Sequence, residues 1–133
     1  MRVSLFIFVF SLFLFSCSSE NLLEAPDTMS DMVSYSGDFV SVAHPTMGKV
    51  TVDQNKSILS IENFKSDDGP VLEMYLATNT NAITFISLGD LKGLEGNYEY
   101  NLPENVDLDT YKFVMVWCVD FSVNFGHAEL TKN

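Results

Sequence analysis

Four side chains could carry chemistry in this sequence of 133 residues: Cys118, His44, His127 and Trp117. The sequence has no glycine-rich phosphate loop, no Cys-x-x-Cys pair, no His-Glu-x-x-His motif and no Cys-x-x-Cys-His haem attachment site. No nucleophile and base are arranged as in a hydrolase. The chemistry open to the chain is therefore that of a single thiol, and this residue set does not decide between an enzyme and a non-catalytic domain.

Cys118 lies late in residues 113–119, which are apolar at nearly every position. In a strand its side chain would share a face with Val114 and Val116, whereas Trp117 would face the other way. A free Cys is often a small buried core residue. A reactive thiolate instead needs access and nearby positive charge, and this segment supplies no Lys or Arg beyond Lys112. The neighbouring residues alone do not decide whether Cys118 is a buried core residue or a reactive thiol.

The sequence predicts no metal site. Copper would need His, Cys and Met close together, but His127 comes nine residues after Cys118 and no Met follows it. The Asp67-Asp68 turn has too few oxygen ligands for calcium, which takes six to eight. His44 precedes Pro45, which favours an extended loop conformation at the histidine.

The N-terminus predicts export. Arg2 is followed by about 11 mostly apolar residues, 5–15, whereas a membrane-spanning helix needs about 20. A short apolar core after a basic start is typical of a secretory signal peptide, and we assign residues 1–16 to it.

The signal ends in a sequence that resembles a bacterial lipobox. Leu14 and Ser16 fit the pattern before Cys17, and Phe15 is bulky for its position. We expect lipid on Cys17, which would hold an exported protein at the membrane surface, facing the periplasm or the cell exterior. The alternative is ordinary cleavage after Ser18. With Cys17 lipidated, Cys118 would have no partner for an intrachain disulfide.

The charge of the chain excludes some partners. The formal net charge is −11, and removal of residues 1–16 would take away one positive charge, Arg2, and leave −12. Nucleic-acid binding depends on Lys and Arg at the phosphates, and anionic lipid heads would repel such a domain. We therefore expect no nucleic-acid partner and membrane contact through the lipid only.

The rest of the chain divides into an acidic tether, residues 17–36, and one all-β domain, residues 37–131. Short apolar alternations separated by turn residues predict about eight strands at residues 39–42, 49–52, 57–61, 71–77, 83–88, 97–102, 112–119 and 121–125. Residues 106–111 read as a turn capped by Asp107 and Asp109. The spacing predicts an antiparallel β-sandwich or barrel-like fold.

Short motifs run through this domain in a definite order. The most specific are Gly69-Pro70, then Leu91-Lys92-Gly93 with Gly96-Asn97-Tyr98, and finally Trp117-Cys118 followed by Phe121-Ser122-Val123-Asn124-Phe125-Gly126. Together with Gly37-x-Phe39, His44-Pro45-Thr46-x-Gly48 and Ile61-Glu62-Asn63-Phe64, they make residues 37–130 resemble the DM-thirteen domain.

The resemblance implies an extracellular β-domain of a family that is sometimes joined to haem-binding DOMON-type domains and is proposed to transfer electrons at cell surfaces. It implies that Cys118 is the redox centre, as a bare thiol or as a ligand to a prosthetic group. Haem held through Cys118 is the group considered, with His44 and Trp117 as further residues of the site. His44 matches a family position, whereas His127 falls where a small apolar residue is expected.

The expected function is that of a surface-anchored accessory domain in extracytoplasmic electron transfer. No partner domain follows in the sequence, so the expected partner is a separate redox or cell-surface protein. The alternative is a non-catalytic binding or adhesion module. In that case Cys118 would be a core residue, and loops 89–96 and 67–70 would form the working surface.

Overall fold

The computed structural model describes residues 32–133, which form nine β-strands and no helix. The strands are β1 (Val33–Ser41), β2 (Thr46–Asp53), β3 (Ile58–Ser66), β4 (Leu72–Ala77), β5 (Phe85–Asp90), β6 (Glu95–Asn101), β7 (Phe113–Cys118), β8 (Val123–Glu129) and β9 (Thr131–Lys132). Every strand pairing is antiparallel. The predicted all-β antiparallel fold is confirmed.

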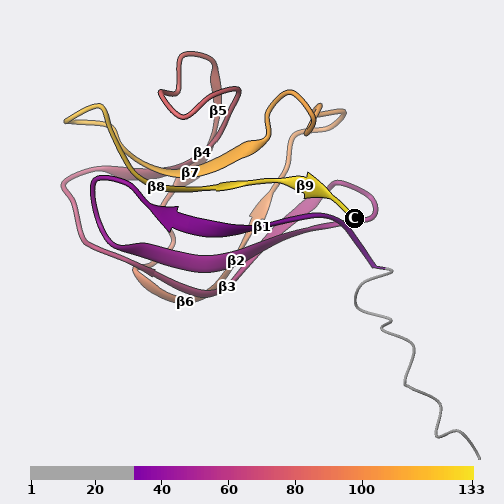
Figure 1. Ribbon diagram of the computed structural model, residues 1–133, viewed down its shortest axis with the longest axis horizontal. Coiled ribbons are helices and arrows are strands. Elements are labelled where there is room, and N and C mark those ends of the chain that lie inside the picture. Colours follow the sequence, from indigo (N-terminus) through magenta and orange to yellow (C-terminus); the bar gives the residue numbers. More distant parts are fainter. Residues whose placement is uncertain (1–31) are drawn as a thin grey trace, which may run out of the picture.

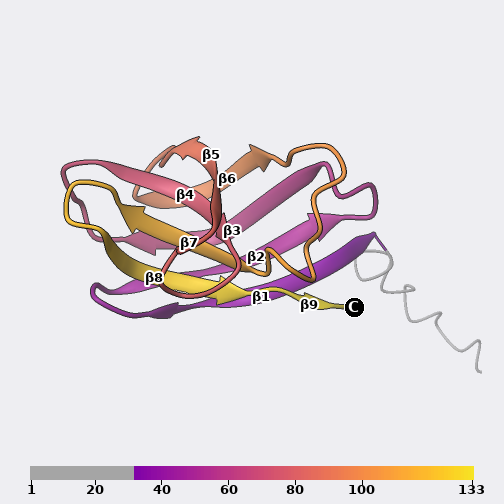
Figure 2. The ribbon, with the colours of Figure 1, turned by 90° about the horizontal axis from the view of Figure 1, so that it is seen from above.

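The strands form one strongly curled sheet in the order β5-β4-β7-β8-β1-β2-β3-β6, with β9 paired to β1. The curl lays β4, β7 and β8 over β1, β2, β3 and β6, so that the two halves enclose a common interior (Figure 1 and Figure 2). The loops after β1, β3 and β7 gather at the end away from the C-terminus (Figure 1). The sheet is therefore barrel-like, with β5 and β6 as its two edges.

Two register shifts bend the half of the sheet that β1, β2, β3 and β6 form. The register between β2 and β3 shifts at Gly48, and that between β3 and β6 shifts next to Asn63. Gly48 has a φ of +139°, and a Cβ there would lie 3.0 Å from the Cα of Phe64. A side chain at this position would meet both backbone strain and backbone atoms. Bulges of this kind increase local twist, which helps the sheet to close on itself.

The interior is filled by aliphatic and aromatic side chains from both halves. On β4 the inward residues are Leu72, Met74 and Leu76, which confirms the predicted period of two. Each fully buried side chain of this size contributes about 1.5–3 kcal/mol of transfer free energy. The other large buried members are Tyr35, Phe39, Val50, Val52, Leu59, Ile61, Phe64, Tyr100, Leu102, Leu108, Val114, Val116, Phe125 and Leu130.

Strand β7 is buried on both faces, as its apolar sequence predicts. Val114, Val116 and Cys118 face the main core. On the other face Met115 joins a second cluster with Tyr75, Ala77 and Ala82. Ala82 belongs to the loop between β4 and β5, which therefore covers the outer face of the sheet.

Residues 91–94, here called the strap, bridge the two edges of the curled sheet. At one end the amide of Leu91 donates to the carbonyl of Leu72 on β4, at 2.9 Å. At the other end the amide of Ser66 on β3 donates to the carbonyl of Leu94, also at 2.9 Å. The phenol oxygen of Tyr100 accepts from the amide of Lys92 at 3.0 Å. The Leu-Lys-Gly motif thus spans the gap between the two edge strands, β5 and β6, which is here called the seam.

Most strand boundaries differ from the sequence predictions by a few residues, and three differences concern the ends of the domain and its last hairpin. β1 begins at Val33, so residues 33–36 pair with β2 and β9 although their composition resembles a tether. The last long strand begins at Val123, and Phe121 lies in the preceding turn instead of within that strand. A short ninth strand, Thr131–Lys132, had no signal because two residues carry no periodicity.

The turn at residues 106–111 forms as predicted, but only one of its two aspartates caps it. Asp107 accepts from the amides of Asp109 and Thr110 and from the Thr110 hydroxyl. These bonds, the Thr110 hydroxyl first, lower the pKa of Asp107. Asp109 instead accepts from the hydroxyl of Tyr35, at 2.9 Å, so it fastens the turn to β1.

The predicted signal peptide, residues 1–16, and the predicted lipidation site, Cys17, lie outside the described residues. Within residues 32–133 no helix is long and apolar enough to cross a membrane.

Candidate functional site

Cys118 ends strand β7 and faces the main core. Its cross-strand neighbours are Leu72 at the start of β4 and Val123 at the start of β8. The side chain is 0% exposed, and its thiol is free. The strand pattern predicted the face on which Cys118 lies, and the structure shows that its side chain is completely buried there.

The thiol does not open into either neighbouring hollow. A hollow of about 200 Å³ under the strap is lined by Leu72, Leu91 and Leu94. A second, of about 420 Å³, is lined by Val123 and Trp117 on the outer side of the sheet. Neither is lined by Cys118 itself. In this arrangement a haem could not reach the sulfur, so the described residues do not fit haem ligation through Cys118.

Trp117 lies on the opposite face of β7, in an aromatic stack. Its ring lies 5.9 Å from that of Tyr75 on β4, with an interplanar angle of 18°. The Tyr75 ring in turn lies 4.2 Å from that of Phe85 on β5. Phe85 is 46% exposed. The stack therefore leads from the residue beside Cys118 to the surface of the molecule.

Tyr75, in the middle of this stack, stays protonated at neutral pH. Burial raises the pKa of its phenol, and the carboxylate of Glu73 raises that pKa further.

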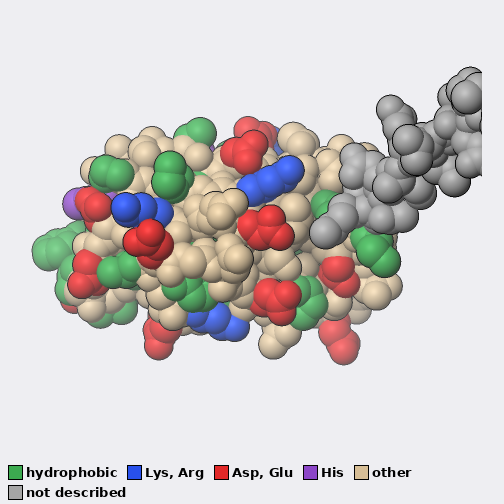
Figure 3. All heavy atoms as spheres, turned by 90° about the horizontal axis from the view of Figure 1, so that it is seen from below, with side chains coloured by type: hydrophobic (Ala, Val, Ile, Leu, Met, Phe, Trp, Pro, Cys, Tyr) green, Lys and Arg blue, Asp and Glu red, His purple; other side chains and the backbone are tan. Residues whose placement is uncertain are grey.

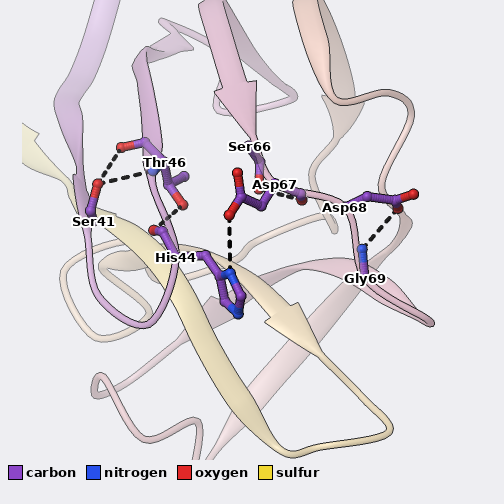
Figure 4. Close-up of polar contacts among 7 residues, drawn as sticks. All are labelled: Ser41, His44, Thr46, Ser66, Asp67, Asp68 and Gly69. Atoms are coloured by element: carbon purple, nitrogen blue, oxygen red, sulfur yellow. Dashed lines mark hydrogen bonds and ion pairs between the residues drawn. The ribbon is translucent and has the colours of Figure 1, made fainter.

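His44 lies at the surface, in the loop between β1 and β2. Its Nδ1 lies 3.1 Å from a carboxylate oxygen of Asp67 (Figure 4). Its ring packs against Phe125 with the centroids 3.9 Å apart. The hydrogen bond and the ring contact both reach other segments, so His44 ties the β1–β2 loop to the β3–β4 loop and to β8.

The same loops are held by further local hydrogen bonds. The Ser41 hydroxyl accepts from the amide of Thr46 at 2.9 Å, and the carboxylate of Asp68 accepts from the amide of Gly69 at 2.8 Å (Figure 4). Asp67 and Asp68 thus have separate partners. Within residues 32–133 no three His, Cys, Asp or Glu side chains form a group that could hold a metal ion.

The three residues assigned to the site from the sequence do not converge as a ligand set. Cys118 is enclosed in the core, Trp117 belongs to the outer face, and His44 is on the surface beyond Phe125. They share one end of the molecule, because Cys118, Phe125 and the His44 loop all lie near the β7–β8 turn. What the structure assembles is a buried thiol with an aromatic stack beside it.

Sequence reasoning missed a polar pair on the outer face. The register between β7 and β8 shifts between Val116 and Trp117, so that one extra residue, Phe125, turns into the core. The bulge lets Asn124 and His127 lie together, and the amide nitrogen of Asn124 donates to Nδ1 of His127 at 3.1 Å. Burial lowers the pKa of His127, opposed by the carboxylate of Glu129.

The orientation of Asn124 is fixed by a second bond. Its amide nitrogen also donates to the carbonyl of Thr80, at 3.0 Å, and a carbonyl can only accept. The Oδ1 atom is therefore left over, and it is a buried side-chain oxygen without a hydrogen-bond partner among the described residues. Only a strand that alternates through Asn124, without a bulge, could be read from the sequence.

Comparison with known proteins identifies the family. Residues 38–130 match the family model described as Electron transfer DM13. No curated protein and no solved structure gives a match. The matched segment takes in β2 to β8 and the end of β1, residues 38–41, with the strap, Trp117 and Cys118 inside it. The family description indicates a redox-related role, and the chain belongs to the electron transfer DM13 family.

Proposed function

We propose that this chain is a surface-anchored accessory domain in extracytoplasmic electron transfer, with Cys118 as its redox-active group. The observation that supports it is the placement of Cys118 one residue from Trp117, whose ring starts a stack leading to the exposed Phe85. Family membership supplies the redox class. The predicted lipid on Cys17 supplies the anchor.

Burial restricts the kind of redox chemistry. Thiol–disulfide exchange requires a second sulfur to contact the first, and the fully buried Cys118 offers no such contact in the folded state. Electron transfer across a few atoms of protein needs no contact. When it donates, the thiol would lose one electron to an oxidised partner protein, and its S–H proton would pass to solvent during local opening of the structure around the sulfur. A returning electron and proton would restore it.

The aromatic stack is the proposed route. The indole of Trp117 and the phenyl ring of Phe85 both stack against Tyr75, and the raised pKa of Tyr75 keeps its proton in place. We propose that the partner is a separate redox or cell-surface protein. A partner that reaches Phe85 or Trp117 would be separated from the sulfur only by the stack and one peptide unit.

Electron exchange with a haem or quinone partner tests this function. Cys118→Ala removes the sulfur and should abolish exchange, while circular dichroism shows the β-sheet intact. Phe85→Leu is expected to slow exchange without stopping it, because one ring of the stack is lost. If Cys118→Ala and Cys118→Ser both keep full exchange, the redox role of Cys118 is wrong.

A binding module without redox chemistry is the second candidate. It is favoured by the complete burial of Cys118 and by the absence of Lys and Arg from β7. In that case the native thiol would react with neither an alkylating reagent nor an oxidant until the protein unfolds, and Cys118→Ala would have no effect on function.

A further inference from the structure

The loops at the end that covers Cys118 form a surface here called the tip: residues 42–45, 67–71 and 119–122. Three hydrogen bonds join them to the sheet and to one another. The amide of Val119 donates to the carbonyl of Val71 at 2.8 Å. The amides of Val42 and His44 both donate to the carbonyl of Phe125. The tip is thus one connected surface (Figure 1).

Large apolar side chains are exposed on the tip. Phe121 is 70% exposed, and Val42, Val71 and Val119 are exposed as well. These residues come from three loops that the fold brings together, so the exposure is a property of the folded surface. Apolar side chains gathered on a surface and rimmed by polar groups mark protein interaction sites.

The rim of the tip is acidic. Asp67, Asp68 and Asp120 are all exposed, and none of the three loops contains Lys or Arg. The nearest lysine along the chain is Lys65, on β3. Figure 3 shows hydrophobic and acidic side chains side by side at this end of the molecule, together with a histidine and a Lys or Arg side chain.

A pocket adjoins the tip on the outer face of the sheet. It has a volume of about 420 Å³, and Val42 and Ser122 of the tip line it together with Trp117 and Asn124. Asn124 contributes to its wall, while the unpartnered Oδ1 of this residue is buried behind the pocket surface. A pocket of this size accommodates one long side chain, with the stem on apolar surface and the polar head free to donate hydrogen bonds.

We infer that the tip and this pocket are the docking surface for a basic protein whose apolar contact patch is ringed by Lys and Arg. The acidic rim complements such a ring, and the exposed valines and Phe121 complement the patch. A Lys or Arg side chain of the partner fits the pocket beside Trp117, where its stem packs on the indole. The three loops contain no Lys or Arg that would compete for this surface, and their one histidine, His44, is already bonded to Asp67.

A lipid surface fits the tip less well. Anionic lipid heads would be repelled by Asp67, Asp68 and Asp120. The tip also lies at the end opposite to the start of β1, where the proposed tether joins the domain (Figure 1). With the domain anchored at that end, the tip would face away from the membrane.

This docking surface deepens the proposed function, on which it rests in one respect: the partner is taken to be the redox partner. Val119 follows Cys118 directly, and Val71 precedes Leu72, the cross-strand neighbour of Cys118. A protein seated on the tip therefore lies over the end of the molecule that holds the thiol. Its side chain in the pocket would also touch Trp117, the ring of the stack next to Cys118. A partner on the tip would therefore exchange electrons at Trp117, and Phe85, beside the Phe113 end of β7, would serve only a partner bound at β5.

Binding of a basic c-type cytochrome to the purified protein tests the inference. We expect amide chemical shifts to move at residues 42–45, 67–71 and 119–122, and affinity to fall at least about tenfold between 50 and 200 mM salt, because such contacts are screened. The double variant D68N/D120N should weaken binding about tenfold at low salt, and Phe121→Ser should weaken it severalfold. The charge-matched control E99Q/E104Q, on β6 and the β6–β7 loop, should leave affinity within about twofold.

The outcomes separate docking from electron transfer. Cys118→Ala should bind the cytochrome as the parent does; binding at the tip without electron exchange would support the docking surface and contradict the redox function. Equal weakening by D68N/D120N and E99Q/E104Q would show nonspecific attraction to an acidic protein and overturn the docking surface. Phe121-dependent binding to neutral phosphatidylcholine vesicles, without cytochrome binding, would assign the tip to lipid and overturn it too.

Discussion

The sulfur of Cys118 lies among aliphatic side chains, where a hydroxyl would lack a hydrogen-bond partner. We expect Cys118→Ser to lower the free energy of unfolding by about 1–3 kcal/mol, the usual cost of a hydroxyl in an apolar site. Urea denaturation measures this change. Cys118→Ala is the control, because it removes the sulfur without burying a polar group. A serine variant as stable as the parent would mean that the site is wet or open.

His127 should make the protein less stable in mild acid. Burial lowers its pKa, so the unfolded chain binds a proton more readily than the folded one as pH falls below the ordinary value of 6.5. The stability associated with neutral His127 is therefore present above that value and is lost as pH falls through the lower folded pKa. Unfolding measured from pH 7.5 to 5 should show this decline.

The matched variants for that measurement are His127→Gln and His44→Gln. The first should remove the part of the decline that His127 causes, because glutamine does not titrate in this range. The second changes the exposed histidine of the tip. If His127→Gln leaves the pH dependence of unfolding unaltered, the half-buried imidazole of His127 is not its source.

Residue types alone could suggest Cys118 and Trp117 but not the neighbours that define their surroundings. Alternation along residues 113–119 placed the two side chains on opposite faces, and this is confirmed. The pair formed by Asn124 and His127 could not be predicted, because it depends on a bulge opposite Val116 and Trp117. The contact between His44 and Asp67 joins residues 23 apart and depends on the closure of the sheet.

At the scale of elements, the strap controls the seam nearest to Cys118. It is bonded to Leu72, the cross-strand neighbour of Cys118. A Cβ at Gly93 would lie 2.1 Å from the hydroxyl oxygen of Tyr98, which donates to the carbonyl of Glu95 at 2.6 Å. A side chain at position 93 therefore forces either the strap or the Tyr98 ring to move.

We expect Gly93→Ala to raise the native-state alkylation rate of Cys118 about tenfold, which corresponds to about 1.4 kcal/mol off the free energy of local opening. The rate is measured by mass spectrometry under conditions that keep the protein folded. Tyr98→Leu in the same chain should restore part of the protection, since it removes the atoms that the new methyl group meets.

Asp53→Ala is the control for this experiment. Asp53 lies at the β2–β3 turn, at the other end of the molecule, and accepts hydrogen bonds from the amides of Ser57 and Ile58. Its loss should lower global stability without opening the strap. Equal acceleration of alkylation by Asp53→Ala and Gly93→Ala would mean that the sulfur is reached only by global unfolding.

The elements themselves were largely predictable, because period-two alternation and turn residues mark most strands. Eight predicted segments overlap eight of the nine described strands. The order of the strands was not predictable, since it depends on pairings such as β3 with β6 that span long stretches of sequence. The strap was visible only as a loop of glycines and leucines, with no indication that it joins two edges.

At the scale of the whole molecule, the proposed lipid anchor lies at the end where β1 begins, and the docking tip lies at the opposite end. We expect Cys17→Ala to release the protein from the membrane fraction, because lipid on Cys17 is the only membrane attachment that we propose. Cell fractionation with immunoblotting measures this. If the variant stays with the membrane as the parent does, the lipid anchor is contradicted. The description of the folded domain does not depend on this result.

The central claim is that Cys118 exchanges electrons, and voltammetry of the purified protein adsorbed on an electrode tests it most directly. The parent should give a redox signal that disappears in Cys118→Ala and stays in His44→Gln, since the electrons are proposed to come from the sulfur. Both variants should keep the β-sheet circular dichroism spectrum of the parent. A signal that survives in folded Cys118→Ala, or a parent protein that gives no signal at all, would contradict the redox role of Cys118.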